Sequence, residues 1–231
     1  MTLYTFCRLF LLFFYFSFFG YIVETTYVSL GTGKLNLNRG FCVGPYIPIY
    51  GIGSLLIVYF ISPYVGNPFL VFVLSFIVCS FVEYIISYLA ELLLKARLWN
   101  YKDRKFNVNG RICLQNSIYF GIGGIFVVYV LNPLFNKLLD LYSEKFLIIC
   151  SIIWIVVFVI DLGLSIFVAI KFSKKVARLK DSTIFINKKR KMMSTKFEKN
   201  FIGRLLKGFP YLNESLDTNF WDKLNIFNKN K

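Results

Sequence analysis

Five long apolar runs follow one another along the chain, and short polar stretches separate them. A helix needs about 20 mainly apolar residues to cross the hydrocarbon core of a bilayer. The runs predict membrane-spanning helices over about 3–30, 46–61, 69–94, 117–135 and 146–170. The pattern therefore predicts an all-α, polytopic membrane protein with about five transmembrane helices, in which residues 1–172 form the transmembrane domain.

The composition agrees with lipid as the solvent of this chain. Of the 231 residues, 57% are hydrophobic and 19% aromatic, whereas only 17% are charged. A soluble protein carries about 25% charged residues. The excess of apolar side chains is larger than one water-soluble core of this size could bury.

Basic residues gather on one side of the expected spans. The stretches 31–45 and 95–116 are basic, 62–68 has no charge, and Asp140 and Glu144 balance the lysines of 136–145. Together with the C-terminal tail, one side holds 24 of the 27 Lys and Arg residues. Since cytoplasmic loops are enriched in Lys and Arg, we expect a multi-pass plasma-membrane protein with its N-terminus outside and its C-terminus in the cytoplasm.

The tail, residues 173–231, is predicted to be a basic cytoplasmic segment. The stretch 171–231 contains 16 of the 27 basic residues, so the net charge of +15 indicates contact with membrane lipids and not with nucleic acid. Apolar positions at helical spacing predict an amphipathic helix over about 196–209. Such a helix either lies on the inner leaflet or docks on a partner protein.

Two stretches of the chain resemble each other, which predicts an internal repeat. The stretch from Asn36 to Pro63 resembles the stretch from Asn107 to Pro133, and YIVE, ending at Glu24, resembles YLAE, ending at Glu91. Matched pairs include Asn36 with Asn107, Asn38 with Asn109, Cys42 with Cys113, Gly51 with Gly121 and Gly53 with Gly123. We expect two parallel hairpin repeats plus a fifth helix, an arrangement that many transporters share.

Charged side chains inside the spans mark the candidate polar site. A charge at the centre of a span costs roughly 2.5–3.5 kcal/mol on insertion scales, so it is expected to face a partner or water. Arg39 and Arg111 are the expected partners of the intramembrane acids. The candidate site comprises Glu24, Glu83, Ser87, Glu91, Asp161, Asn38, Arg39, Asn109 and Arg111. A structural network that locks the helices together is the alternative interpretation.

Glycines and prolines beside this site predict a broken backbone. They are Gly40, Gly44, Pro45, Pro48, Gly51 and Gly53. Non-helical backbone at membrane depth persists only where it is buried in protein or lines a wet cavity. Gly51 and Gly53, like the cluster from Gly121 to Gly124, also predict close helix packing.

Several chemistries are excluded or disfavoured by the residue types present. The chain has no histidine, which excludes His-based acid–base catalysis and metal sites with His ligands. It has no GxxxxGK[ST] motif, so no P-loop ATPase is expected within it. The five cysteines lack CxxC spacing and are expected to be buried thiols. No metal, no cofactor and no assigned catalytic residue are expected.

Ordered motifs carry a resemblance to a known family. The motifs are Gly20 with Glu24, Asn38-Arg39-Gly40-Phe41, Gly44-Pro45, Pro48 to Gly53, Glu83-x3-Ser87-x3-Glu91, and Asn109-Gly110-Arg111-Ile112 with Leu114 and Ser117. Over roughly residues 10–135 the chain resembles bacterial membrane proteins described as Putative ABC-transporter type IV. Trp99-Asn100-Tyr101 resembles the Trp-Asp-Tyr element of that family, with Asn100 in place of the acid, and Tyr119-Phe120-Gly121 also departs from its pattern. The resemblance implies a permease-like membrane subunit, without a substrate or catalytic residues.

Three functions remain open at this point. The favoured one is a transport-related membrane component, which would work with a separate ATPase subunit or as a homo-oligomer. The second is a membrane-embedded enzyme that acts on a lipid headgroup at the inner face, with Arg39 and Arg111 holding phosphate and Glu83 or Glu91 acting as base. The third is a scaffold that recruits a partner through its tail. The sequence favours a protein that is not an enzyme.

Overall fold

A computed structural model of the chain describes residues 2–37, 39–94, 97–179 and 203–204. The elements are α1 (Leu3–Thr32), α2 (Pro48–Phe60), η1 (Ser62–Tyr64), α3 (Pro68–Leu94), β1 (Asn107–Val108), β2 (Ile112–Cys113), α4 (Leu114–Phe126), η2 (Val127–Leu131), α5 (Asn132–Asp140) and α6 (Glu144–Leu179). Helices make up most of the described chain, and η2 is a π-helical turn between α4 and α5.

Four helical stretches are long and apolar enough to cross a membrane. They are Leu3–Thr32, Pro68–Leu94, Leu114–Asp140 and Glu144–Lys171. The expected span over 46–61 is shorter than predicted, because α2 has 13 residues and is therefore about 20 Å long, against a hydrocarbon core of about 30 Å. The chain is thus mostly helical with four candidate spans among the described residues, and the count of five is not confirmed.

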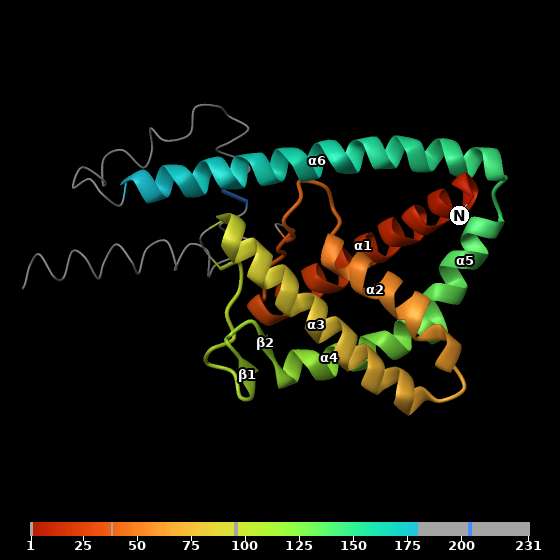
Figure 1. The fold of residues 1–231 in the computed structure, drawn as a ribbon, viewed down its shortest axis with the longest axis horizontal. Coiled ribbons are helices and arrows are strands. Elements are labelled where there is room, and N and C mark those ends of the chain that lie inside the picture. The colour runs from red at the N-terminus through yellow and green to blue at the C-terminus, as the bar shows by residue number, and fades with distance from the viewer. Residues whose placement is uncertain (1, 38, 95–96, 180–202, 205–231) are drawn as a thin grey trace, which may run out of the picture.

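The helices run alternately between two ends of the molecule (Figure 1). One end holds the N-terminus, η1 and α5, and the other holds β1, β2 and the C-terminal part of α6. At the first end, the Arg8 guanidinium lies 2.7 Å from an Asp140 carboxylate oxygen and 2.9 Å from the Asn136 amide oxygen. This ion pair joins the start of α1 to the end of α5.

Helices α1 to α4 pack as two antiparallel helical hairpins, α1 with α2 and α3 with α4 (Figure 1). These hairpins share a hydrophobic core with η2, α5 and the start of α6, and its buried residues are Leu11, Leu12, Phe16, Ile57, Ile61, Val71, Val127, Val128, Leu131, Leu139 and Leu147. Helix α6 lies along α1, where the ring centres of Trp154 and Phe14 are 4.4 Å apart and those of Phe158 and Phe13 are 5.3 Å apart. Few side chains over Glu144–Lys171 of α6 are buried, as expected for a helix that faces lipid.

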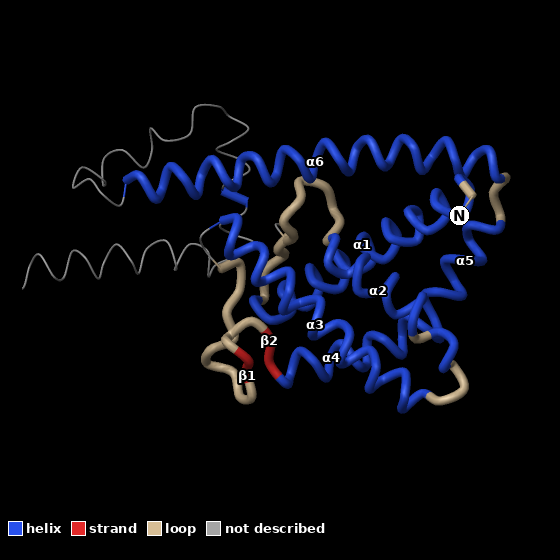
Figure 2. The backbone as a smooth tube through the Cα atoms, in the orientation of Figure 1, coloured by secondary structure: helices blue, strands red, loops and turns tan. Residues whose placement is uncertain are grey.

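A two-stranded antiparallel hairpin, β1–β2, interrupts the all-α pattern (Figure 2). Its turn places Asn109 (φ 53°) and Gly110 (φ 67°) in the left-handed region. The Arg111 N–H donates to the Val108 carbonyl oxygen over 3.0 Å. Asn and Gly tolerate this conformation best, and Asn-Gly is a strong hairpin signal. The all-α prediction missed this element, although the dipeptide indicates it.

Glycines allow the helices of each hairpin to approach closely, as the sequence predicted. A Cβ added to Gly51 of α2 would lie 2.2 Å from the Ser17 hydroxyl of α1. A Cβ added to Gly124 of α4 would lie 2.0 Å from the Ser75 hydroxyl of α3. Gly123 has no such neighbour within 4 Å. The two hairpins therefore depend on glycine at specific positions.

Gly124→Ala should destabilise the protein, because the new methyl group overlaps Ser75 and forces α3 and α4 apart. We expect a loss of about 1–3 kcal/mol, typical of overpacking, read as a lower midpoint of thermal unfolding in detergent. Gly123→Ala is the matched control and should leave the midpoint unchanged or raise it slightly. Equal midpoints for the two variants would contradict the close contact.

Candidate functional site

The segment between α1 and α2 returns into the body of the helices without helical structure (Figure 1). The Ile47 N–H donates to the Ser17 carbonyl oxygen over 3.0 Å, and Ser17 lies near the middle of α1. Gly40 has a φ of 88°, which an L-residue with a side chain rarely adopts. Residues 39–47 therefore form a re-entrant segment that reaches the middle of a candidate span.

Asp161 of α6 holds this re-entrant segment in place. One carboxylate oxygen accepts from the Val43 N–H over 2.8 Å, and the other accepts from the Gly44 N–H over 2.8 Å. The Tyr46 hydroxyl and the Ser165 hydroxyl also donate to this carboxylate. Because α6 is far away in sequence, the contact ties the last candidate span to the first hairpin.

Arg204, from the tail, contacts the other side of the same backbone. Its guanidinium donates to the Val43 carbonyl oxygen over 2.8 Å and to the Cys42 carbonyl oxygen. Most of the expected helix over 196–209 lies outside the described residues, which include only Gly203 and Arg204 in that stretch. Two N–H groups and two carbonyl groups of the re-entrant segment are thus bound, by Asp161 and by Arg204 respectively.

Glu24 and Arg39 form an ion pair across the first hairpin. The Arg39 guanidinium lies 2.5 Å from a Glu24 carboxylate oxygen, and the two side chains are 16% and 25% exposed. The other oxygen of Glu24 accepts from the Tyr50 hydroxyl of α2 over 3.0 Å. Tyr50 also fills the space beside Gly20, where a Cβ would lie 2.4 Å from its ring. The pair is therefore fixed by both helices of the hairpin.

Glu83 lies in the middle of α3 and is 6% exposed. One carboxylate oxygen accepts from the Tyr101 hydroxyl over 3.2 Å, and the other has no hydrogen-bond partner among the described residues. Burial, followed by the charge and hydrogen bond of Glu83, raises the pKa of Tyr101, which therefore stays a donor. Glu83 is a buried carboxylate with spare acceptor capacity.

Glu91, near the end of α3, binds two arginines of the segment that connects α3 to α4. The Arg97 Nε lies 3.0 Å from Glu91 Oε2, and the Arg111 Nη2 lies 2.8 Å from the same oxygen. Arg111 is buried and also lies 3.5 Å from the Ser87 hydroxyl. Its guanidinium carbon stands 5.6 Å from the Tyr84 ring centre and 5.3 Å from the Tyr88 ring centre, within the range of cation–π attraction.

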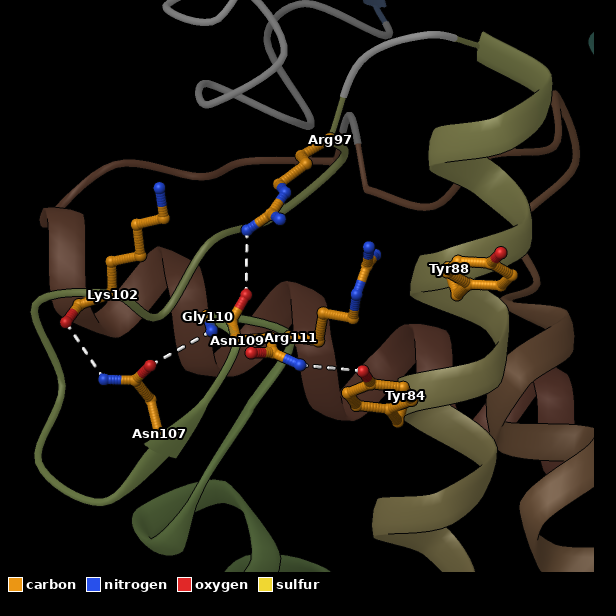
Figure 3. A pocket seen from close by; sticks show the side chains of 8 residues that line it. All are labelled: Tyr84, Tyr88, Arg97, Lys102, Asn107, Asn109, Gly110 and Arg111. Carbon is orange, nitrogen blue, oxygen red and sulfur yellow. Dashed lines mark hydrogen bonds between the residues drawn. The ribbon is translucent and has the colours of Figure 1, made fainter.

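A pocket of about 510 Å³ opens beside Arg111. Its lining consists of Tyr84, Tyr88, Arg97, Lys102, Asn107, Asn109, Gly110 and Arg111. Figure 3 shows the arginines and Lys102 on the hairpin side and the tyrosines on α3. The Asn109 amide donates to the Tyr84 hydroxyl over 2.9 Å, and the Arg97 guanidinium donates to the Asn109 carbonyl oxygen over 2.9 Å.

The structure distributes the predicted residues over several separate contacts and does not gather them in one site. Arg39 meets Glu24, Arg111 meets Glu91 and Ser87, and Asn109 lies at the pocket, whereas Asp161 binds backbone N–H groups and Glu83 binds a tyrosine. Asn38 lies outside the described residues. The functional role of these side chains stays a prediction, and no group of metal ligands occurs among the residues that the structure describes.

The broken backbone is shorter than the sequence suggested. Gly40, Gly44 and Pro45 lie in the re-entrant segment, whereas Pro48 is already the first residue of α2. Proline suits this position because the first turn of a helix does not need its N–H. Gly51 and Gly53 therefore lie in regular helix, and Gly51 serves close packing against α1.

Sequence reasoning missed most of the partners. The sequence assigns no carboxylate partner to Tyr46, Tyr50 or Tyr101, although their hydroxyl groups bind Asp161, Glu24 and Glu83, respectively. Arg97 was counted only as a loop charge. A spacing of six residues from Glu91, just past the end of a helix, could have indicated that its long side chain folds back. The tyrosines carry no comparable signal in a chain with 15 of them.

Asp161→Asn should loosen the re-entrant segment. The amide keeps one acceptor oxygen, so at least one of the N–H groups of Val43 and Gly44 loses its partner at a cost of about 1–3 kcal/mol. We expect a lower midpoint of thermal unfolding and faster proteolysis within residues 39–47. Asp103→Asn, on an exposed loop, makes the same chemical change and should alter neither measurement. Unchanged proteolysis in Asp161→Asn would contradict this anchoring role.

Glu24 and Arg39 should be energetically coupled. A double-mutant cycle with Glu24→Gln and Arg39→Gln should give a coupling free energy of unfolding of about 0.5–3 kcal/mol, as expected for contacting groups. Glu24→Gln combined with Asp103→Asn should instead be additive. A coupling energy indistinguishable from zero would show that the 2.5 Å pair does not contribute to stability.

Comparison with known proteins places these features in a family. A family model described as Putative ABC-transporter type IV matches residues 11–166, which is more than half of the chain. No curated protein and no solved structure matches the chain. The family match confirms the resemblance carried by the motifs, and together with the apolar helices it supports a multi-pass membrane protein. The chain belongs to the family described as Putative ABC-transporter type IV.

Proposed function

We propose that this protein is a permease-like membrane component of a transport system and works with a separate ATPase subunit. The family supplies the class, since its description names an ABC transporter. The basic loops support an orientation with the N-terminus outside and the C-terminus in the cytoplasm. No substrate follows from the family description.

The re-entrant segment is the observation that carries this proposal. Residues 39–47 bring non-helical backbone to the middle of α1, where Ile47 bonds to Ser17. Lipid tolerates such backbone only where protein buries it or a cavity borders it. Transporters commonly place interrupted helices at the membrane midplane, where freed backbone groups contact the cargo.

Glu83 supports the proposal from the facing helix. It lies eleven residues before the end of α3, and thus about 16 Å from that end. Inserting an ionisable side chain at this depth costs free energy, so such residues usually have a function or pair with another polar group. With one oxygen bound by Tyr101 and the other without a partner among the described residues, Glu83 can accept a proton or a donor from a cargo.

The two ion pairs support the predicted parallel repeats. Glu24 and Glu91 are repeat mates, and so are the motifs that contain Arg39 and Arg111. Each acid bonds to the arginine of its own hairpin, over 2.5 Å and 2.8 Å. Two equivalent halves would line the transport pathway from opposite sides.

The enzyme alternative finds less support in this geometry. Glu91, one of its two proposed bases, accepts from two guanidinium groups through the same oxygen, so it is engaged in structure. Glu83 is not among the residues that line the basic pocket where a phosphate would bind. The scaffold alternative rests on the tail, nearly all of which lies outside the described residues.

A co-purification and reconstitution experiment tests the transport proposal. The full chain, tagged and expressed in its native host, should retain an ATPase subunit that mass spectrometry identifies. In proteoliposomes the pair should hydrolyse ATP faster than the ATPase alone. Glu83→Gln should keep the complex but remove this stimulation, because a neutral amide cannot take up and release a proton.

Asp103→Asn serves as the control, since it removes an acid from an exposed loop and should leave the stimulation intact. Two results would overturn the proposal. In one, no ATPase co-purifies with the chain. In the other, the ATPase hydrolyses ATP at the same rate with and without it.

A further inference from the structure

The pocket between α3 and the β1–β2 hairpin carries a second, independent inference. We propose that it binds the phosphate group of an anionic ligand, either the headgroup of a lipid or a free phosphate ester. The proposal does not rest on transport, because neither Glu83 nor any residue of the re-entrant segment lines the pocket.

Charge in this pocket is strongly one-sided. Three of its lining residues are cations, namely Arg97, Lys102 and Arg111, and none is an acid. The neighbouring Glu91 offsets only part of this charge, since one carboxylate binds both arginines. An anion that enters the pocket would therefore meet net positive charge on the hairpin side (Figure 3).

Glu91 also prepares the arginines for a ligand. It fixes Arg97 through Nε and Arg111 through Nη2, so neither long side chain has to be ordered when the ligand arrives. Guanidinium groups carry five N–H donors in a planar fork that matches phosphate oxygens. The contacts with Glu91 and Ser87 use two of the five donors of Arg111.

The tyrosines complete the donor set. Tyr84 accepts from the Asn109 amide over 2.9 Å, so its own O–H proton is free to point toward another acceptor. The Arg111 guanidinium carbon lies 5.6 Å from the centre of the Tyr84 ring and 5.3 Å from the centre of the Tyr88 ring. These contacts hold the buried Arg111 side chain beside the pocket.

Gly110 sets the shape of the pocket on the hairpin side. Its φ of 67° is left-handed, and an added Cβ would lie 2.8 Å from the Lys102 side chain and 3.2 Å from the Arg97 guanidinium. Two of the three cations thus approach the turn closely because residue 110 has no side chain. The Asn-Gly turn has a geometric role in the pocket besides closing the hairpin.

The position along α3 suits a phosphate at the membrane surface. Tyr88 lies six residues before the end of this helix at Leu94, about 9 Å from that end, whereas Tyr84, next to Glu83, lies deeper, about 15 Å from it. Tyrosine is enriched at the level of lipid headgroups. Lys102, on the loop beyond the helix, is exposed to solvent and could reach either kind of phosphate.

Binding to the purified full chain in detergent tests this inference. The probes are dihexanoyl-phosphatidylglycerol, inorganic phosphate, and dihexanoylglycerol as the phosphate-free analogue, all measured by isothermal titration calorimetry. The wild type should bind the phosphatidylglycerol and not the diacylglycerol. Lys102→Gln should weaken binding about fivefold, the effect expected for one cation near an anionic lipid phosphate.

Lys105→Gln is the matched control, because it removes the same charge from the same exposed loop outside the pocket lining. Arg111→Lys keeps the charge but loses the planar fork, and it should also weaken binding while the thermal midpoint shows that the protein is folded. If inorganic phosphate displaces the lipid at similar concentrations, free phosphate esters are the ligands. Displacement only at far higher concentrations would identify the lipid headgroup.

Three results would overturn the inference. The first is the absence of binding by both phosphate probes. The second is equal binding of dihexanoylglycerol, which would show that the acyl chains alone are recognised. The third is an equal loss for Lys102→Gln and Lys105→Gln, which would show that the overall charge of the loop, and not the pocket, attracts the anion.

Discussion

The carboxylate of Asp161 is the constraint on which the rest of this structure depends. Backbone N–H groups outside a helix cannot remain unpaired in an apolar layer, and Asp161 pairs those of Val43 and Gly44. With these groups bound, residues 39–47 can pass between the helices as a non-helical chain with several bends. That path in turn sets where α2 begins, where Tyr50 meets Glu24, and where α6 lies against α1.

Hydropathy predicted the long helices well, because lipid exposure demands apolar side chains on nearly every face. For α1 and α3, both predicted ends lie within two residues of the observed ones. The helix expected over 46–61 is found at Pro48–Phe60, and it starts two residues late because the apolar residues 46 and 47 are not helical and belong to the re-entrant segment. A run of apolar residues indicates that the segment is buried, but it does not indicate whether the backbone is helical.

The candidate site also combines contacts that the sequence predicts with contacts that it does not. Opposite charges in an apolar chain have few possible partners, so the pairing of Arg39 and Arg111 with intramembrane acids could be expected from sequence. Hydroxyl partners are different, because a tyrosine packs equally well as an apolar residue. The roles of Tyr46 and Tyr101 depend on which helix faces which, and the distances of 115 and 18 residues to their acids leave no local pattern.

The contact between Asp161 and the re-entrant segment also orders the events of biogenesis. The chain is made from the N-terminus, and the N–H groups of Val43 and Gly44 emerge 118 and 117 residues before the carboxylate that binds them. Until α6 has been synthesised, those groups need water or another temporary partner. The first hairpin can therefore reach its final depth only after the last long helix is in the membrane, so a chain truncated before α6 would lack the acceptor that completes α1 and α2.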